Sequence, residues 1–147
     1  MILGIDPGTK GGLAVLNSAG QPLLIGKFDG LSIHETVNLV KDAAALSWSG
    51  VCYLEKVGYI KGDGGKGSFT FGKVYGVLYA TALSAGLEVK DVYPLAWQSF
   101  MQCATGGNKN VSKQRAMSLW PRVAVTHHIA DALLIAEYGR RQILGIK

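Results

Sequence analysis

Residues 1–16, MILGIDPGTKGGLAVL, decide the fold. This stretch contains two short apolar runs separated by Asp6, a proline and several glycines, and a third apolar run follows. The three runs lie at residues 1–6, 12–16 and 22–28. Apolar runs spaced about ten residues apart and separated by turn residues predict an antiparallel meander. The first run ends in an acid followed by glycines, which places a carboxylate at the edge where open α/β sheets carry their sites.

After the meander, helical and β-rich segments alternate. Ser32 followed by Glu35 forms a capping box, which predicts the start of a helix. We expect strands at residues 50–55 and 87–93, and helices at residues 33–46, 69–85, 95–102, 111–119 and 126–143. This order predicts an α/β layered domain with a mixed five-stranded sheet, antiparallel at one edge and parallel at its centre.

The chain has 147 residues, of which 48% are apolar, so we expect one domain, residues 1–147, with a buried core. No stretch approaches the roughly 18–20 continuous apolar residues of a membrane span, so we expect none. Cys52 and Cys103 show no metal-ligand spacing, which favours reduced thiols in a cytoplasmic protein. Residues 58–67, with five glycines, predict a mobile loop inside the domain.

Positive charge is concentrated in the second part of the chain. The net charge is +5, but residues 1–60 carry four basic and five acidic side chains, whereas residues 61–147 carry eleven and five. The resulting split of −1 and +6 suggests a polyanionic partner, most simply nucleic acid.

Three acidic residues lie in apolar surroundings, where an ordinary solvent-exposed side chain is not expected. Asp6 and Glu55 each end an apolar run, and Asp131 lies in an apolar helix with His127 and His128 three or four residues before it. Clustered carboxylates remain ionised only around a cation. Oxygen ligands with one imidazole suit Mg²⁺, for which Mn²⁺ can substitute. Such ions activate water in phosphodiester hydrolysis.

The motifs ILGIDPGTKGGLAV, YLEKV and HHIADALLIAEYG resemble, in this order, the RuvC family of Holliday junction resolvases, and phage-type members in particular. The resemblance implies an RNase H-like three-layer fold and a metal site formed by Asp6, Glu55, His128 and Asp131. The family commonly has Asp at the position of His128, so this residue is expected either to bind metal or to position the attacking water. We expect His127 not to be a ligand.

The resemblance also implies a DNA-binding surface. The segment TGGNKNVSKQRAM matches a family loop and helix that touch the junction backbone, with Lys109, Lys113 and Arg115 in suitable places. A lysine near the scissile phosphate, such as Lys113, would stabilise developing negative charge and so count as catalytic. The glycine-rich segment and the following helix supply further candidates for DNA contact, namely Tyr59, Lys61, Lys66 and Phe69. Phe69 is equally compatible with a place in the core.

The function that these motifs imply is paired, Mg²⁺-dependent cleavage of four-way junctions in a bacterial or phage-infected cytoplasm. Two symmetric cuts by a chain with one site imply a homodimer. Gly72, Gly76 and Ala80 form a small-residue stripe that would pack on the partner or on the chain's own sheet. The alternatives are a broader branched-DNA or flap nuclease, an RNA–DNA hybrid nuclease, and a catalytically weak junction-binding module. An actin-like ATPase needs two such lobes and is disfavoured by length.

Overall fold

The computed structural model describes residues 1–46, 50–56, 58, 64–104 and 106–147. Its sheet has five strands, in the spatial order β3-β2-β1-β4-β5. Their bounds are β1 Ile2–Asp6, β2 Gly12–Leu16, β3 Pro22–Lys27, β4 Val51–Glu55 and β5 Glu88–Val92. Strands β1, β2 and β3 pair antiparallel, whereas β1, β4 and β5 run parallel. The predicted mixed sheet is therefore confirmed.

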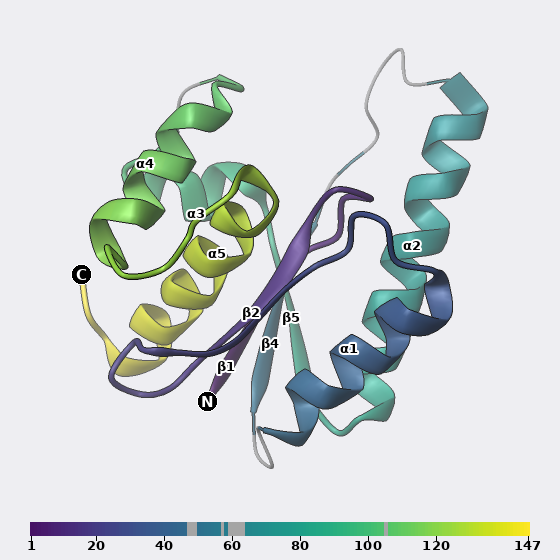
Figure 1. Ribbon diagram of the computed structural model, residues 1–147, viewed down its shortest axis with the longest axis horizontal. Helices are drawn as coiled ribbons and strands as arrows, with labels where there is room; N and C mark the ends of the chain where they lie inside the picture. Colours follow the sequence, from purple (N-terminus) through teal and green to yellow (C-terminus); the bar gives the residue numbers. More distant parts are fainter. Residues whose placement is uncertain (47–49, 57, 59–63, 105) are drawn as a thin grey trace.

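Helices cover both faces of this sheet. They are α1 Ile33–Ala45, α2 Gly64–Ser84, α3 Pro94–Phe100, α4 Lys109–Leu119 and α5 His127–Leu144. Helices α1 and α2 lie on one face, and α3, α4 and α5 lie on the other, as Figure 1 shows. The expected three layers are thus present. No helix in the described part of the chain is both long enough and apolar enough to span a membrane.

Helix α5 packs directly on the strands that carry the first motif. It contacts β1 and β2 more extensively than any other helix contacts the sheet. A Cβ atom added at Gly4 would lie 2.3 Å from the backbone nitrogen of Ala136, so only glycine permits this approach. This close packing sets the distance between α5 and β1. It thereby positions the polar residues near the start of α5 relative to the end of β1.

The ends of the helices largely follow the expected signals. The predicted capping box of Ser32 and Glu35 is present at the start of α1. Helix α5 ends at Leu144, one residue beyond the expected end, and Gly145 caps it in a left-handed conformation, with φ 65°. Helix α2 differs, because it begins at Gly64 instead of Phe69. Once a helix has nucleated, each added residue gains a backbone hydrogen bond, which lets α2 extend through the last four residues of the expected glycine loop. Residues 59–63 of that loop lie outside the described residues.

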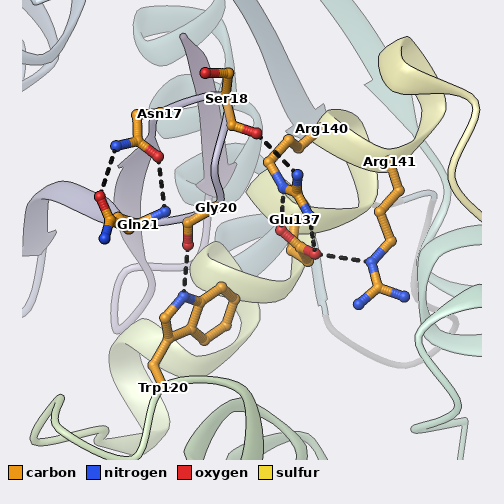
Figure 2. Close-up of polar contacts among 8 residues, drawn as sticks. All are labelled: Asn17, Ser18, Gly20, Gln21, Trp120, Glu137, Arg140 and Arg141. Atoms are coloured by element: carbon orange, nitrogen blue, oxygen red, sulfur yellow. Dashed lines mark hydrogen bonds and ion pairs between the residues drawn. The ribbon is translucent and has the colours of Figure 1, made fainter.

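A buried ion-pair network holds the turn between β2 and β3 against α5 (Figure 2). Glu137 is only 4% exposed and accepts hydrogen bonds from Arg140 and Arg141 at 2.7–2.8 Å. Burial alone would raise the pKa of Glu137, but these guanidinium groups outweigh it and lower the pKa. Arg140 also donates to the carbonyl oxygen of Ser18 at 2.9 Å. The network anchors the hairpin at the end of the sheet opposite Asp6.

Candidate active site

Asp6 and Glu55 end neighbouring parallel strands. Ile5 of β1 pairs with Leu54 of β4, so the two acids follow at the same carboxyl edge of the sheet. The backbone N–H of Gly8 donates to Oδ1 of Asp6 at 3.0 Å. The strand-end pattern in the sequence therefore located two side chains that the fold brings together.

The two carboxylates are hard to ionise in this setting. Burial raises the pKa of Asp6 to about 6. The hydrogen bond from the Gly8 N–H lowers this pKa, whereas the negative charge of Asp131 raises it further. Burial likewise raises the pKa of Glu55 to about 7, with further contributions from the charges of Asp6 and Asp131. The charge of Asp131 thus raises the pKa of both Asp6 and Glu55, which ties the three carboxyl groups to one another electrostatically.

Asp131 is the third member of the group and comes from α5. Burial raises its pKa, although a hydrogen bond from Ser112 and the charges of Lys109 and His127 lower it. Its Oδ1 atom is buried and has no hydrogen-bond partner among the described residues. Because a buried carboxylate oxygen normally has a partner, this atom is available for a ligand.

His128 stands one turn before Asp131 on α5 and faces the loop after Asp6. Its Nδ1 atom lies 2.6 Å from the main-chain oxygen of Lys10. Asp6 and His128 line the same cleft, and the charge of His128 lowers the pKa of Asp6. Both residues were predicted from the sequence as site residues, and the fold brings them together.

An open cleft connects Asp6 and His128 to solvent. It has a volume of about 590 Å³ and is lined by Asp6, Gly8, Thr9, Lys10, Gly11, Lys109, His127 and His128. A smaller pocket of about 110 Å³ adjoins it and is lined by Gln98, Cys103, Gly107, Asn108, Lys109, Ser112 and Asp131. Lys109, the first residue of α4, lines both. Its positive charge lowers the pKa of all three carboxyl groups.

The donors suit a hard divalent cation. The three carboxyl groups have raised pKa values, and one carboxylate oxygen has no partner among the described residues. A bound divalent cation would compensate the negative charges and take that oxygen as a ligand. Among the described residues, however, no group of three or more His, Cys, Asp or Glu side chains is arranged around one point as a formed metal site. The donors are present at one edge, and binding would require the side chains to draw together.

The two lysines of α4 occupy different environments. Lys109 lines the cleft, whereas Lys113, one turn further along, is half-buried and lines neither of the two pockets. Arg115 is also half-buried, and its Nε donates to the carbonyl oxygen of Met101 at 2.9 Å. Of these three basic residues, Lys109 is the one that the structure places beside the carboxylates.

Two of the remaining residues proposed for DNA contact, Lys66 and Phe69, lie on α2. Lys66 is exposed in its first turn and lines an open groove with Gly8 and Thr9 of the loop after β1. Phe69 is 75% exposed, so it is not a core residue. Tyr59 and Lys61 lie outside the described residues. The groove runs from the start of α2 to the loop that follows Asp6.

Sequence reasoning missed a polar partner of the carboxylates. Trp97 of α3 donates from Nε1 to Oε1 of Glu55 at 2.8 Å. A buried tryptophan requires an acceptor for its N–H, and this requirement was the available signal. It could not identify the acceptor, because Trp97 and Glu55 are 42 residues apart.

The comparisons with known proteins concern the whole chain. No protein-family model matches it, and no curated protein matches it in sequence. Among solved structures, Thermus thermophilus RuvC matches with 17% identity and a TM-score of 0.68, covering 99% of this chain and 96% of RuvC. T. thermophilus RuvC in complex with Holliday junction substrate matches with 18% identity and a TM-score of 0.72, at the same coverage. The chain therefore has the fold of RuvC.

Proposed function

We propose that this protein is a homodimeric, divalent-metal-dependent endonuclease that resolves four-way DNA junctions. One observation carries the proposal: Asp6, Glu55 and Asp131 gather with His128 at the carboxyl edge of a RuvC fold, with their charges insufficiently compensated. The similar structure of RuvC in complex with a Holliday junction substrate supports the choice of DNA.

We assign the metal ligands to Asp6, Glu55 and Asp131, with His128 as the fourth candidate. When bound, Mg²⁺ or Mn²⁺ supplies Lewis-acid chemistry, lowering the pKa of water and offsetting charge on the phosphodiester. His128 can hold or accept a proton at Nε2, because its Nδ1 is engaged by Lys10. The ammonium group of Lys109 lies where it can stabilise negative charge that develops on the phosphate.

Basic residues beside the cleft would bind the DNA backbone. Lys10 and Lys109 line the cleft itself, and Lys66 lines the groove that leads away from it. Each of these lysines can neutralise a phosphate, so binding should weaken as salt concentration rises. The exposed ring of Phe69, near the same groove, can stack on an unpaired base at the junction centre.

We assign the dimer contact to an exposed stripe on α2. Its members are spaced by three or four residues and are all exposed: Gly72, Gly76, Ala80 and Leu83. Added Cβ atoms at Gly72 and Gly76 would meet nothing within 4 Å, so this stripe does not pack on the chain's own sheet. The small residues beside Leu83 allow a second helix to approach closely, which suits a two-fold contact.

We expect the protein to act in the cytoplasm, in agreement with two buried free cysteines, Cys52 and Cys103. The direct test of the activity is cleavage of a synthetic four-way junction, a flap, an RNA–DNA hybrid and a linear duplex, each with Mg²⁺, Mn²⁺ or EDTA. We expect junction cleavage with either metal and none with EDTA. Equal cleavage in EDTA would exclude the metal mechanism, and preference for another substrate would exclude the resolvase assignment.

A further inference from the structure

We propose that Trp97 is a positioning residue: its indole N–H fixes Oε1 of Glu55, which limits the orientations from which this carboxylate can reach a divalent metal ion. This inference rests on the proposed function, because it takes Glu55 as a ligand of that ion. One contact carries it: Nε1 of Trp97 donates to Oε1 of Glu55 at 2.8 Å.

The burial of the indole makes this contact specific. Trp97 is fully buried, with 0% of its surface exposed, and Glu55 is 9% exposed. An indole nitrogen can only donate, and a buried donor without an acceptor is strongly unfavourable. The Glu55 carboxylate is the acceptor that the structure provides, so Trp97 and Glu55 constrain each other's side-chain orientation.

The backbone that carries Trp97 is held firmly. Pro94 occupies the first turn of α3, where its fixed φ favours the helix. The N–H of Met101 donates to the carbonyl oxygen of Trp97 at 2.8 Å, and the carbonyl oxygen of Met101 accepts from Arg115 of α4 at 2.9 Å. The indole is therefore presented to Glu55 from a helix that is tied to its neighbour.

Glu55 needs such support because two other carboxylates, Asp6 and Asp131, repel it. Repulsion from Asp6 and Asp131 favours orientations of the Glu55 side chain that point away from them. The bond from Trp97 opposes this tendency and uses Oε1, which leaves Oε2 available to a metal ion. Hydrogen bonds that orient metal ligands in this way commonly change metal affinity by about 10–100-fold when removed.

A pair of matched variants tests the inference. Trp97→Phe keeps an aromatic ring and removes only the N–H donor. Trp120→Phe is the control, because Trp120 is also buried, at 8% exposure, and its Nε1 also donates at 2.8 Å. Its acceptor is the carbonyl oxygen of Gly20 (Figure 2), in the turn between β2 and β3 at the end of the sheet opposite Asp6.

The measurement is Mn²⁺ binding by titration calorimetry, without DNA, on the full chain. We expect Trp97→Phe to weaken Mn²⁺ binding by about tenfold, and Trp120→Phe to leave the affinity within about twofold of wild type. Unchanged affinity in Trp97→Phe, or equal weakening in both variants, would overturn the inference. Absence of Mn²⁺ binding to the wild type would overturn it as well.

A second measurement on the wild type covers the case in which Trp97→Phe does not fold. In ¹H–¹⁵N spectra, the indole signal of Trp97 should shift on Mg²⁺ addition, and that of Trp120 should not. A Trp97 signal that ignores Mg²⁺ would contradict the inference. The two hypotheses fail separately: a wild type that binds Mn²⁺ through this arrangement but does not cut junctions refutes the proposed function and leaves the role of Trp97 intact.

Discussion

The Nδ1 atom of His128 lies 2.6 Å from the main-chain oxygen of Lys10. A carbonyl oxygen can only accept, so Nδ1 carries the proton and neutral His128 keeps a lone pair on Nε2. This tautomer is the one that binds a metal ion or takes a proton from water. The contact also ties the start of α5 to the loop that follows Asp6.

Loss of this imidazole should therefore affect the chemical step. We expect His128→Ala to lower the junction cleavage rate by about 10²–10⁴-fold, the usual contribution of a general base. His128→Asp should cut faster than His128→Ala, because a carboxylate offers ligand oxygens in the same place. The measurement is single-turnover cleavage with excess enzyme. Cleavage by His128→Ala at the wild-type rate would remove His128 from the site.

Neutralising Asp6 should stabilise the metal-free fold at neutral and higher pH. The folded pKa of Asp6 is raised to about 6, above the ordinary value of 3.8. Folding therefore favours the protonated form, and stability falls as pH rises through the interval between these two values. Asp6→Asn should gain on the order of 1–2 kcal/mol at pH 8 and almost nothing at pH 3.5.

Chemical denaturation without metal at these two pH values measures the effect. Asn keeps an oxygen that can accept the Gly8 N–H, so the hydrogen bond at 3.0 Å is retained as a control on local geometry. A variant less stable than wild type at pH 8 would show that the ionised Asp6 carboxylate does not destabilise the folded state.

The contact between β1 and α5 should tolerate no added side chain at Gly4. An alanine Cβ there would meet backbone atoms of Ala132 and Ala136 at 2.5 and 2.3 Å, so α5 would have to move off the sheet. We expect Gly4→Ala to cost about 1–3 kcal/mol or more of unfolding free energy. Gly65→Ala, which has open space around it, is the control and should be neutral or stabilising.

Disrupting the α2 stripe should separate the protomers without unfolding them. We expect Gly76→Glu to shift the protein from dimer to monomer in analytical ultracentrifugation, because the carboxylate would be buried against the partner's apolar surface. Thermal stability of the monomer should change little, since a Cβ atom added at Gly76 would meet nothing within 4 Å. Ala45→Glu, at an exposed position of α1, is the control. A Gly76→Glu protein that stays dimeric would place the interface elsewhere.

Local rules predicted much of the fold and of the site. Asp6 and Glu55 were found because a strand that ends in an acid carries that acid to the carboxyl edge, whatever lies on the faces of the sheet. Asp131 was found because its helix is apolar on most sides, and α5 is indeed largely buried. Ser32 was found because the capping box is read within four residues.

Two kinds of feature were harder to predict: contacts between segments that are distant in the sequence, and helix ends at residues with low helix propensity. The bond from Trp97 to Glu55 joins α3 to β4 across 42 residues, and nothing near either residue specifies the other. The choice between Lys109 and Lys113 depends on where α4 begins relative to the cleft, which follows from its packing on α5. The start of α2 at Gly64 was missed because glycine propensity argues against a helix there.

The proposed function is tested most sharply by incision of a supercoiled plasmid that extrudes a cruciform, with wild type and Asp6→Asn compared in Mg²⁺. A single nick releases the supercoiling and removes the junction, so linear product requires two cuts within one complex. We predict linear DNA from wild type, and uncut plasmid from Asp6→Asn despite unchanged junction binding. Nicked circles as the sole wild-type product, or linear DNA from Asp6→Asn at the wild-type rate, would contradict the account.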